Sequence, residues 1–274
     1  KGRAHDDTRL QSGDEVRIPP IRYTEKESEH SAPPLKLSEM PPILFEDQNI
    51  MVVDKPAGMA SHGGSGISYG LIERMRASRP ELPFLELVHR LDRGTSGVLV
   101  LAKTRKALVR LHEMIREGEM HKTYQALVKG DWQNDRQHAK FPLFKYVTPS
   151  GERRVRVDPE NGLPSHSIFR LKERFGPVSL VEVDLLTGRT HQIRVHAAEL
   201  GFPLVGDEKY GDFAFNDEVA HGSLGVPFKR MFLHSGKICF HHPITGEELE
   251  IEAPLPKDCV ELIEVLEQRK AQNK

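Results

Sequence analysis

Cysteine and long apolar runs are what this chain of 274 residues has least of. Cys239 and Cys259 are its only cysteines, and no Cys-x-x-Cys pair is present, which disfavours a disulfide scaffold and a thiolate zinc site. No apolar run approaches the roughly 18 residues that a membrane-spanning helix needs, and no signal peptide is visible. We therefore expect a cytoplasmic protein. Because the chain starts at Lys1 and not at Met, we also expect that an N-terminal piece is missing.

An excess of positive charge is also lacking, since 39 Lys and Arg stand against 40 Asp and Glu. A neutral chain has no overall attraction for phosphate, which counts against nucleic-acid binding. What matters for such binding is a local basic face. Two short basic runs qualify, residues 103–106 with Arg110, and Arg153-Arg154 with Arg156. Each run is equally typical of an ordinary solvated face.

The first part of the chain differs in composition from the rest. Residues 1–38 are polar, contain two Pro-Pro pairs and show no apolar periodicity. Such a composition cannot bury enough surface to order itself, so we interpret it as a linker region. Apolar runs become regular from Ile43 onward, and residues 39–274 are long enough to form a domain with a sizeable core.

The pattern of apolar residues predicts a mixture of strands and helices. Short apolar or alternating runs predict strands at residues 43–46, 50–53, 98–102, 124–128, 179–186, 232–240 and 248–251. Helical spacing predicts helices at residues 69–77, from an N-cap at Thr104 to Gly118, from an N-cap at Thr190 to Gly201, and around residues 262–266. Because strands and helices interleave without regular β-α-β repetition, the fold class is α+β.

One acidic side chain lies in an unusual setting. Asp92 stands between Arg90 and Arg93, just before the apolar strand at residues 98–102. A carboxylate at the mouth of a buried strand is costly unless it is paired or takes part in chemistry. The arginines would hold it ionised, and an ionised carboxylate can act as a nucleophile or a base. The alternative is a turn aspartate beside solvated arginines.

The segment His89–Gly97 resembles the signature of RNA pseudouridine synthases, whose motif reads His-Arg-Leu-Asp-x-x-Thr-Ser-Gly. The resemblance runs from about Ile43 to Leu255. Further blocks of that family stand in the same order along the chain, at residues 55–58, 122–124, 187–196, 232–234 and 242–247. It implies a long, mixed, largely antiparallel sheet with flanking helices and a central cleft. It also implies isomerisation of uridine to pseudouridine in 23S ribosomal RNA, as in the multi-site large-subunit subgroup.

The resemblance assigns roles to individual residues. It makes Asp92 the catalytic carboxylate and Arg194 its basic partner. Tyr124 would stack on the uracil near C5, where a proton must be lost, and is the candidate general base. Ile193 would form part of the apolar floor beneath the base. The target uridine must leave the helix stack to be reached.

Four further residues of the matched blocks are assigned to substrate binding. Arg90 would occupy the gap that the flipped uridine leaves, since a planar guanidinium can stack there. Thr95 and Arg189 belong to the same blocks. His89 is expected to shape its turn rather than to titrate.

Partners and cofactors follow from the implied reaction. No electrons or atoms are gained, so we expect no cofactor and no metal. We expect RNA as the partner, neither DNA nor a membrane, and a monomer. Residues 10–20 resemble the closing strand of a small S4-type RNA-binding domain, which precedes the catalytic domain in the same subgroup.

Other interpretations of the sequence lead elsewhere. A binding protein that keeps this scaffold without turnover is disfavoured by the intact Asp92. A retaining glycosidase would need a second carboxylate about 5 Å away, where the matched blocks offer arginine and tyrosine. The 14 histidines invite a metal site, but His191 and His196 are five residues apart, not four. Residues 62–66 lack the Gly-Lys-Ser/Thr ending of a phosphate loop, and we interpret them as a flexible active-site loop.

Overall fold

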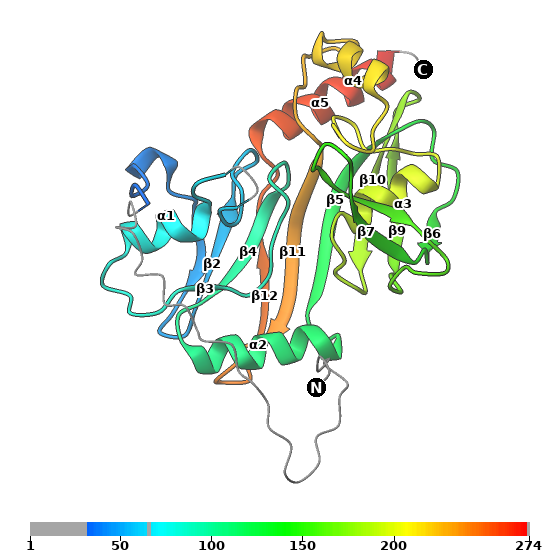
Figure 1. Cartoon of the computed structure of the whole chain (residues 1–274). Helices are drawn as coiled ribbons and strands as arrows, with labels where there is room; N and C mark the ends of the chain where they lie inside the picture. Colours follow the sequence, from blue (N-terminus) through cyan, green and yellow to red (C-terminus); the bar gives the residue numbers. More distant parts are fainter. Residues whose placement is uncertain (1–31, 65–66, 273–274) are drawn as a thin grey trace. The chain divides into compact units, whose positions relative to one another are not determined.

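The computed structural model describes residues 32–64 and 67–272 (Figure 1). The expected S4-like remnant at residues 10–20 lies outside the described residues. The main sheet contains β1 (Ile43–Glu46), β2 (Ile50–Lys55), β3 (Glu86–Leu87), β4 (Ser96–Ala102), β5 (His121–Lys129), β6 (Arg136–Ala139), β9 (Ser167–Arg174), β10 (Val178–Leu185), β11 (Leu233–His241) and β12 (Glu248–Glu252). A separate hairpin is formed by β7 (Leu143–Val147) and β8 (Arg153–Val157). The helices are η1 (Leu37–Glu39, a 3-10 turn), α1 (Leu71–Ser78), α2 (Arg105–Glu117), α3 (Gln192–Glu199), α4 (Phe213–Ala220) and α5 (Lys257–Gln272).

The sheet is mixed and mostly antiparallel. Its strand order is β1-β2-β4-β11-β5-β10-β9-β6, with β3 paired to β4 and β12 paired to β11. Among the described strands only β4 and β11 run parallel, and they meet where His234 faces Ser96 and Ser235 faces Gly97. Figure 1 shows β4, β11 and β5 side by side at the centre of this sheet. The α+β class expected from the sequence is therefore confirmed.

Alternation along the central strands builds a core on both faces of the sheet. On β4, Leu99 and Leu101 join a cluster with α1, whereas Val98 and Val100 join a different cluster with α2. A strand directs successive side chains to opposite faces, so α1 and α2 cover opposite faces of the sheet. The α1 cluster also contains Ile193 of α3, so α1 and α3 contribute to the same core.

The helix ends test the predictions made from local sequence. The prediction for α2 is confirmed, since the Thr104 side chain accepts a hydrogen bond from the N–H of Ala107 and Gly118 ends the helix at φ 75°. The prediction that Thr190 caps the next helix is wrong. α3 begins one residue later, after His191, which makes no capping side-chain hydrogen bond. The described part of the expected linker is also ordered, because Leu35 is buried in the α1 cluster.

Among the described residues, no helix is both long and apolar enough to cross a membrane. Strand β4, which follows Asp92 in the sequence, packs closely against β11. Gly97 has φ 112°, and a Cβ atom there would lie 2.2 Å from the backbone oxygen of Ser235 on β11. Only glycine fits this position, because L side chains both avoid that φ and need space that β11 already occupies.

We expect Gly97→Ala to destabilise the protein by at least about 2 kcal/mol more than Gly118→Ala. Both glycines have positive φ, but a Cβ at Gly118 would meet nothing within 4 Å, so that variant loses only the backbone term. Urea unfolding followed by circular dichroism measures both changes. Equal losses would contradict the close packing of β4 on β11.

Candidate active site

Asp92 lies in the loop between β3 and β4, and hydrogen bonds fix the backbone of that loop. The Ser61 hydroxyl donates to the carbonyl of Leu91 (2.8 Å) and accepts from its N–H (3.0 Å). The N–H of Thr95 donates to the carbonyl of Asp92 (3.0 Å), and the N–H of Gly58 donates to the carbonyl of Arg93 (2.7 Å). The loop is therefore held on both sides of the carboxylate, which leaves the Asp92 side chain part-exposed.

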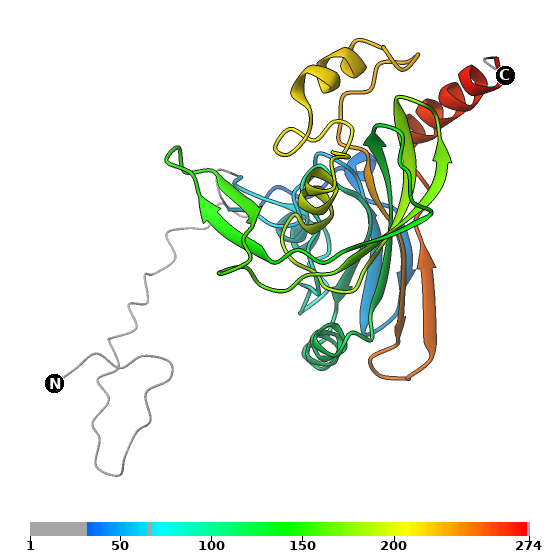
Figure 2. The same cartoon turned by 90° about the vertical axis from the view of Figure 1, so that its right-hand side faces the viewer.

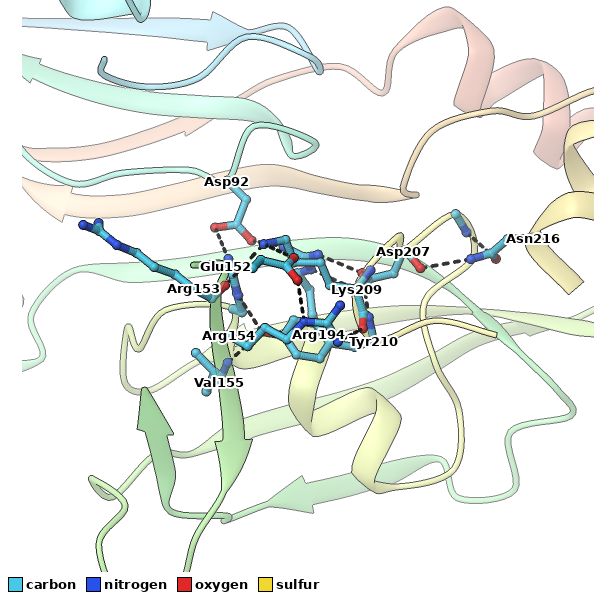
Figure 3. Close-up of polar contacts among 12 residues, drawn as sticks. Asp92, Glu152, Arg153, Arg154, Val155, Arg194, Asp207, Lys209, Tyr210 and Asn216 are labelled. Atoms are coloured by element: carbon cyan, nitrogen blue, oxygen red, sulfur yellow. Dashed lines mark hydrogen bonds and ion pairs between the residues drawn. The ribbon is translucent and has the colours of Figure 1, made fainter. Parts of the chain in front are cut away.

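Arg194 joins Asp92 to a second carboxylate that the sequence analysis did not single out. Its Nη1 donates to Asp92 Oδ2 at 3.0 Å, while Nε and Nη2 donate to Asp207 Oδ2 and Oδ1 at 2.8 and 2.7 Å. Figure 3 shows the guanidinium between the two carboxylates. The predicted pairing of Asp92 with Arg194 is thus present in the structure, across 102 residues of sequence.

Asp207 is fully buried and is itself firmly held. Its Oδ1 also accepts from the backbone N–H groups of Lys209 (2.8 Å) and Tyr210 (3.1 Å). The preceding Gly206 has φ 76°, and a Cβ there would lie 1.9 Å from the carbonyl oxygen of Arg230. Asn216 closes the turn, since its side chain accepts from the N–H of Gly206 and donates to the carbonyl of Asp207.

Arg194 and Asp207 stabilise each other's ionised form. Burial alone would raise the pKa of Asp207, but the hydrogen bonds and charge of Arg194 lower it overall. Burial would lower the pKa of Arg194, but Asp207 and then Asp92 raise it well above its usual range. Breaking one partner of such a pair leaves a buried charge uncompensated. Arg194 therefore presents a permanent positive charge to Asp92.

Tyr124 and Ile193, the two residues expected to contact the uracil, are part of the hydrophobic core. Tyr124 is on β5 and Ile193 is in α3, and both belong to the α1 cluster. Burial raises the pKa of Tyr124 strongly, and the charge of Asp92 adds to that effect. The phenol therefore stays protonated at neutral pH.

Lys55 is a second buried group near Asp92 that sequence reasoning did not assign to the site. It is fully buried, and its Nζ donates to the carbonyls of Pro56 (2.9 Å) and Met59 (2.7 Å). Burial lowers its pKa to about 7, and the charge of Asp92 partly opposes that shift. The two hydrogen bonds of Lys55 therefore fix the backbone of residues 56–59 close to the loop that carries Asp92.

The expected substrate-binding residues Arg90, His89 and Arg189 make hydrogen bonds to groups outside the Asp92–Arg194 pair. Arg90 is exposed and its Nη1 lies 2.8 Å from His62 Nε2. His89 accepts a hydrogen bond from the N–H of Val100, and burial lowers its pKa to about 3, so it is a neutral turn residue. Thr95 is buried, and Arg189 is exposed with Nε donating to the carbonyl of Pro164.

A cavity of about 480 Å³ lies beside the loop that carries Asp92, since Arg93 is part of its lining. Its lining includes residues 56–60, Arg74 and Arg93, but not Asp92. Within residues 32–64 and 67–272, no group of three or more acidic, His or Cys side chains has the arrangement of a metal site. His242 instead accepts backbone hydrogen bonds in its own turn and contacts Asp47.

Comparison with known proteins places this site in a family. The model of the RNA pseudouridylate synthase family matches residues 49–199, a span that includes Asp92, Tyr124 and Arg194. The chain belongs to the RNA pseudouridylate synthase family, and it is accordingly an isomerase.

Individual relatives agree with that assignment. The chain is 49% identical to the ribosomal large subunit pseudouridine synthase C of Salmonella typhi, over 97% of this chain and 83% of the relative. It is 49% identical to the protein of the same name from Escherichia coli, over 93% and 80%. Among solved structures, human RNA pseudouridylate synthase domain containing 1 is similar, with a TM-score of 0.63 and 27% identity over 84% of this chain and 95% of that chain. The human domain-containing 4 protein shares the fold, with a TM-score of 0.66 and 24% identity over 82% and 92%.

We expect Asp207→Asn to lower the free energy of unfolding by about 3 kcal/mol, because the amide places an N–H against the buried guanidinium of Arg194. Asp212→Asn is the matched control. Asp212 caps α4 and pairs with Lys129 at the surface, and asparagine caps equally well, so the loss should stay below about 1 kcal/mol. Urea unfolding measures both. Similar losses in the two variants would contradict a dominant Arg194–Asp207 pair.

Proposed function

We propose that this protein converts uridines of 23S ribosomal RNA into pseudouridines. The observation that carries the proposal is the pairing of a part-exposed Asp92 with a buried Arg194 that Asp207 fixes in place. The two bacterial relatives named as large-subunit pseudouridine synthases support ribosomal RNA as the substrate. RNA is then the partner of this chain, and the target uridine is extruded from its stack before it reacts.

The reaction rearranges one glycosidic bond. The bond from ribose C1′ to uracil N1 breaks and a bond from C1′ to C5 forms, while C5 loses a proton and N1 gains one. Because oxidation state is unchanged, the reaction needs no redox or group-transfer cofactor. Asp92 would either attack C1′ or remove the C2′ proton and later return it. Both routes require an ionised carboxylate, and the charge of Arg194 favours that form.

Tyr124, Ile193 and Arg90 are proposed to contact the substrate rather than to take part in bond cleavage. Tyr124 would contact the base and Ile193 would support it from the core. Since burial holds Tyr124 in its protonated form, we propose that it acts mainly by contact and hydrogen bonding. Removal of the C5 proton by this residue would require that its own proton leave in the same step. Arg90 is exposed and positioned on the same loop as Asp92, which suits insertion into the RNA stack.

A retaining glycosidase remains the competing chemistry at an anomeric carbon. It needs a second carboxylic acid that can protonate the leaving group. Asp207 is the second carboxylate bound to Arg194, but it is fully buried and both of its oxygens accept hydrogen bonds from that guanidinium. Its lowered pKa also makes it a poor acid, so the site favours the isomerase.

Both basic runs of the sequence combine paired and unpaired side chains. Arg105 and Lys106 of the first run are exposed and have no carboxylate partner among the described residues, whereas Arg154 and Arg156 of the second run pair with Glu152 and Asp158. In the first run, Lys103 pairs with Glu46, and Arg110 lies within 4 Å of three glutamates, at positions 113, 117 and 119. In the second run, Arg153 is exposed on β8, and within the described part of the chain its guanidinium has no carboxylate partner. Figure 2 shows the β7–β8 hairpin and α3 on the same side of the sheet. We propose that this hairpin contacts the RNA backbone.

We expect Asp92→Asn to abolish pseudouridine formation while the fold and RNA affinity are kept, because the amide is nearly isosteric but is neither a nucleophile nor a base. Turnover should fall below about 1% of wild type, which corresponds to at least ~2.7 kcal/mol of barrier. Tritium release from C5-labelled uridine in a 23S rRNA fragment measures the rate. Residual turnover above that level would show that Asp92 is not the essential group.

The RNA target has its own test. Pseudouridines are mapped in ribosomal RNA from cells with and without the gene for this chain, and from cells that express only the Asp92→Asn variant. Loss of the same 23S positions in the last two strains supports the proposal. An unchanged map of 23S rRNA would contradict it.

Arg153→Gln should reduce the salt dependence of RNA binding, with a slope of log Kd against log salt smaller by about 1, as expected for the loss of one phosphate contact. Arg110→Gln is the control, since its three glutamate neighbours already neutralise it, and its slope should match wild type. Filter binding across a salt series measures both. An unchanged slope for Arg153→Gln would remove this hairpin residue from the RNA interface.

A further inference from the structure

His191 occupies a strained position one turn before Arg194. Its backbone lies in the left-handed region with φ 54° and ψ 22°, and it is the one non-glycine residue with positive φ among residues 32–64 and 67–272. Such positions cost free energy and are frequent at functional sites, and histidine tolerates them better than most residues. In this conformation the imidazole makes no capping hydrogen bond in α3, and its Nε2 lies 3.8 Å from Asp92 Oδ1.

A chain of hydrogen bonds fixes which imidazole nitrogen carries the proton. The backbone N–H of Val155 on β8 donates to Tyr210 Oη at 2.9 Å, and that oxygen lies 2.7 Å from His191 Nδ1. Burial raises the pKa of Tyr210 to about 12, so the phenol keeps its proton at neutral pH. Because Tyr210 Oη already accepts from Val155, its own hydrogen is free to point at Nδ1. Neutral His191 then carries its proton on Nε2.

That Nε2–H group faces the oxygen of Asp92 that Arg194 does not hold. Nε2 lies 3.8 Å from Asp92 Oδ1, whereas Arg194 Nη1 is bonded to Oδ2. We propose that His191, as the Nε2–H tautomer, is a positioning residue that binds Asp92 Oδ1 when RNA is bound. The inference rests on the proposed function, since it concerns the carboxylate of that reaction. A shift of about 1 Å closes the gap, and catalytic hydrogen bonds are often long before substrate binds.

The same chain of contacts connects the catalytic carboxylate to the β7–β8 hairpin. Glu152, in the turn just before β8, pairs with Lys209, and Arg154 donates to the carbonyl of Lys209. Val155 then holds the Tyr210 hydroxyl, as Figure 3 shows. The hairpin proposed to contact RNA therefore also sets the proton position on His191. The placement of the hairpin therefore affects the orientation of Asp92 through the proton on His191.

Protonation of His191 at low pH would disrupt this arrangement. The charged groups around it are Asp92 and Asp207, which raise its pKa, and Arg194 and Lys209, which lower it, while Tyr210 contacts its ring. Burial is the largest effect, and the pKa lies below its usual value of 6.5. Above that pKa the neutral tautomer is present. Below it, Nδ1 gains a proton and can no longer accept from Tyr210, so the rate constant should fall on the acid side.

Two substitutions separate positioning from a structural role. Asparagine tolerates the left-handed backbone, and its amide reaches Tyr210 but falls short of Asp92. His191→Asn should therefore lower kcat roughly tenfold, as for one charge-assisted hydrogen bond, with KM for RNA unchanged. His191→Gln places an N–H near the Nε2 position and should recover most of kcat. The acid limb of both variants should differ from that of wild type, because protonation at position 191 no longer contributes to it and only the requirement for an ionised Asp92 remains. An Asn variant with wild-type kcat, a Gln variant no faster than Asn, or an acid limb identical to that of wild type in both variants would each overturn the proposal.

Tyr210→Phe and a spectroscopic measurement complete the test. Removing the hydroxyl removes the donor that stabilises neutral Nδ1, so the acid limb should move to higher pH. Independently of activity, ¹⁵N NMR of the histidine-labelled full chain should show His191 protonated at Nε2, with the signal assigned by its loss in the Asn variant. Protonation at Nδ1 would overturn the inference even if the enzyme is active. If wild type makes no pseudouridine while the Nε2–H signal is present, the proposed function fails instead.

Discussion

The buried contact between Arg194 and Asp207 is the interaction on which the site depends. It holds a guanidinium in the protein interior with one N–H group directed at Asp92. A buried charge is tolerated only when it is paired and hydrogen-bonded, and Asp207 meets that condition with both of its oxygens. Around this pair the chain adopts left-handed conformations at Gly206, where glycine tolerates them, and at His191, where they cost free energy. Local strain is thus offset by a charge network that no single segment of the chain contains.

Local sequence signals predicted the elements that depend on neighbours in sequence. α2 begins and ends at the predicted Thr104 and Gly118 because cap and C-terminal glycine act within one helical turn. The strands between residues 136 and 174 escaped prediction, since β6 and β8 carry charged residues on exposed faces and lack a clean apolar alternation. α3 also started differently from prediction, because contacts with Tyr210 and Asp92 decide the conformation of His191.

The residues proposed to be catalytic could be predicted only as far as motifs describe them. Asp92, Tyr124 and Arg194 stand in recognisable blocks, whereas Asp207 and Ser61 contact partners 13 and 30 positions away, and no motif around them indicates a role. Lys55 stands in the matched block at residues 55–58, but its burial near Asp92 could not be predicted from that block. The substrate-binding roles of Arg90, Thr95 and Arg189 stay predictions. His89 illustrates the opposite case, a motif residue whose ring nitrogen accepts a backbone hydrogen bond from Val100.

The place of β11 in the sheet has a consequence for biosynthesis. This strand lies near the C-terminal end of the sequence, yet in the sheet it stands between β4 and β5, which are made much earlier. Until residues 233–241 leave the ribosome, the halves that carry Asp92 and Arg194 have no strand to join them. Domains dominated by such non-local pairing fold slowly and expose unpaired edges meanwhile. A nascent chain of this protein therefore cannot modify RNA until β11 has been synthesised and has joined the sheet.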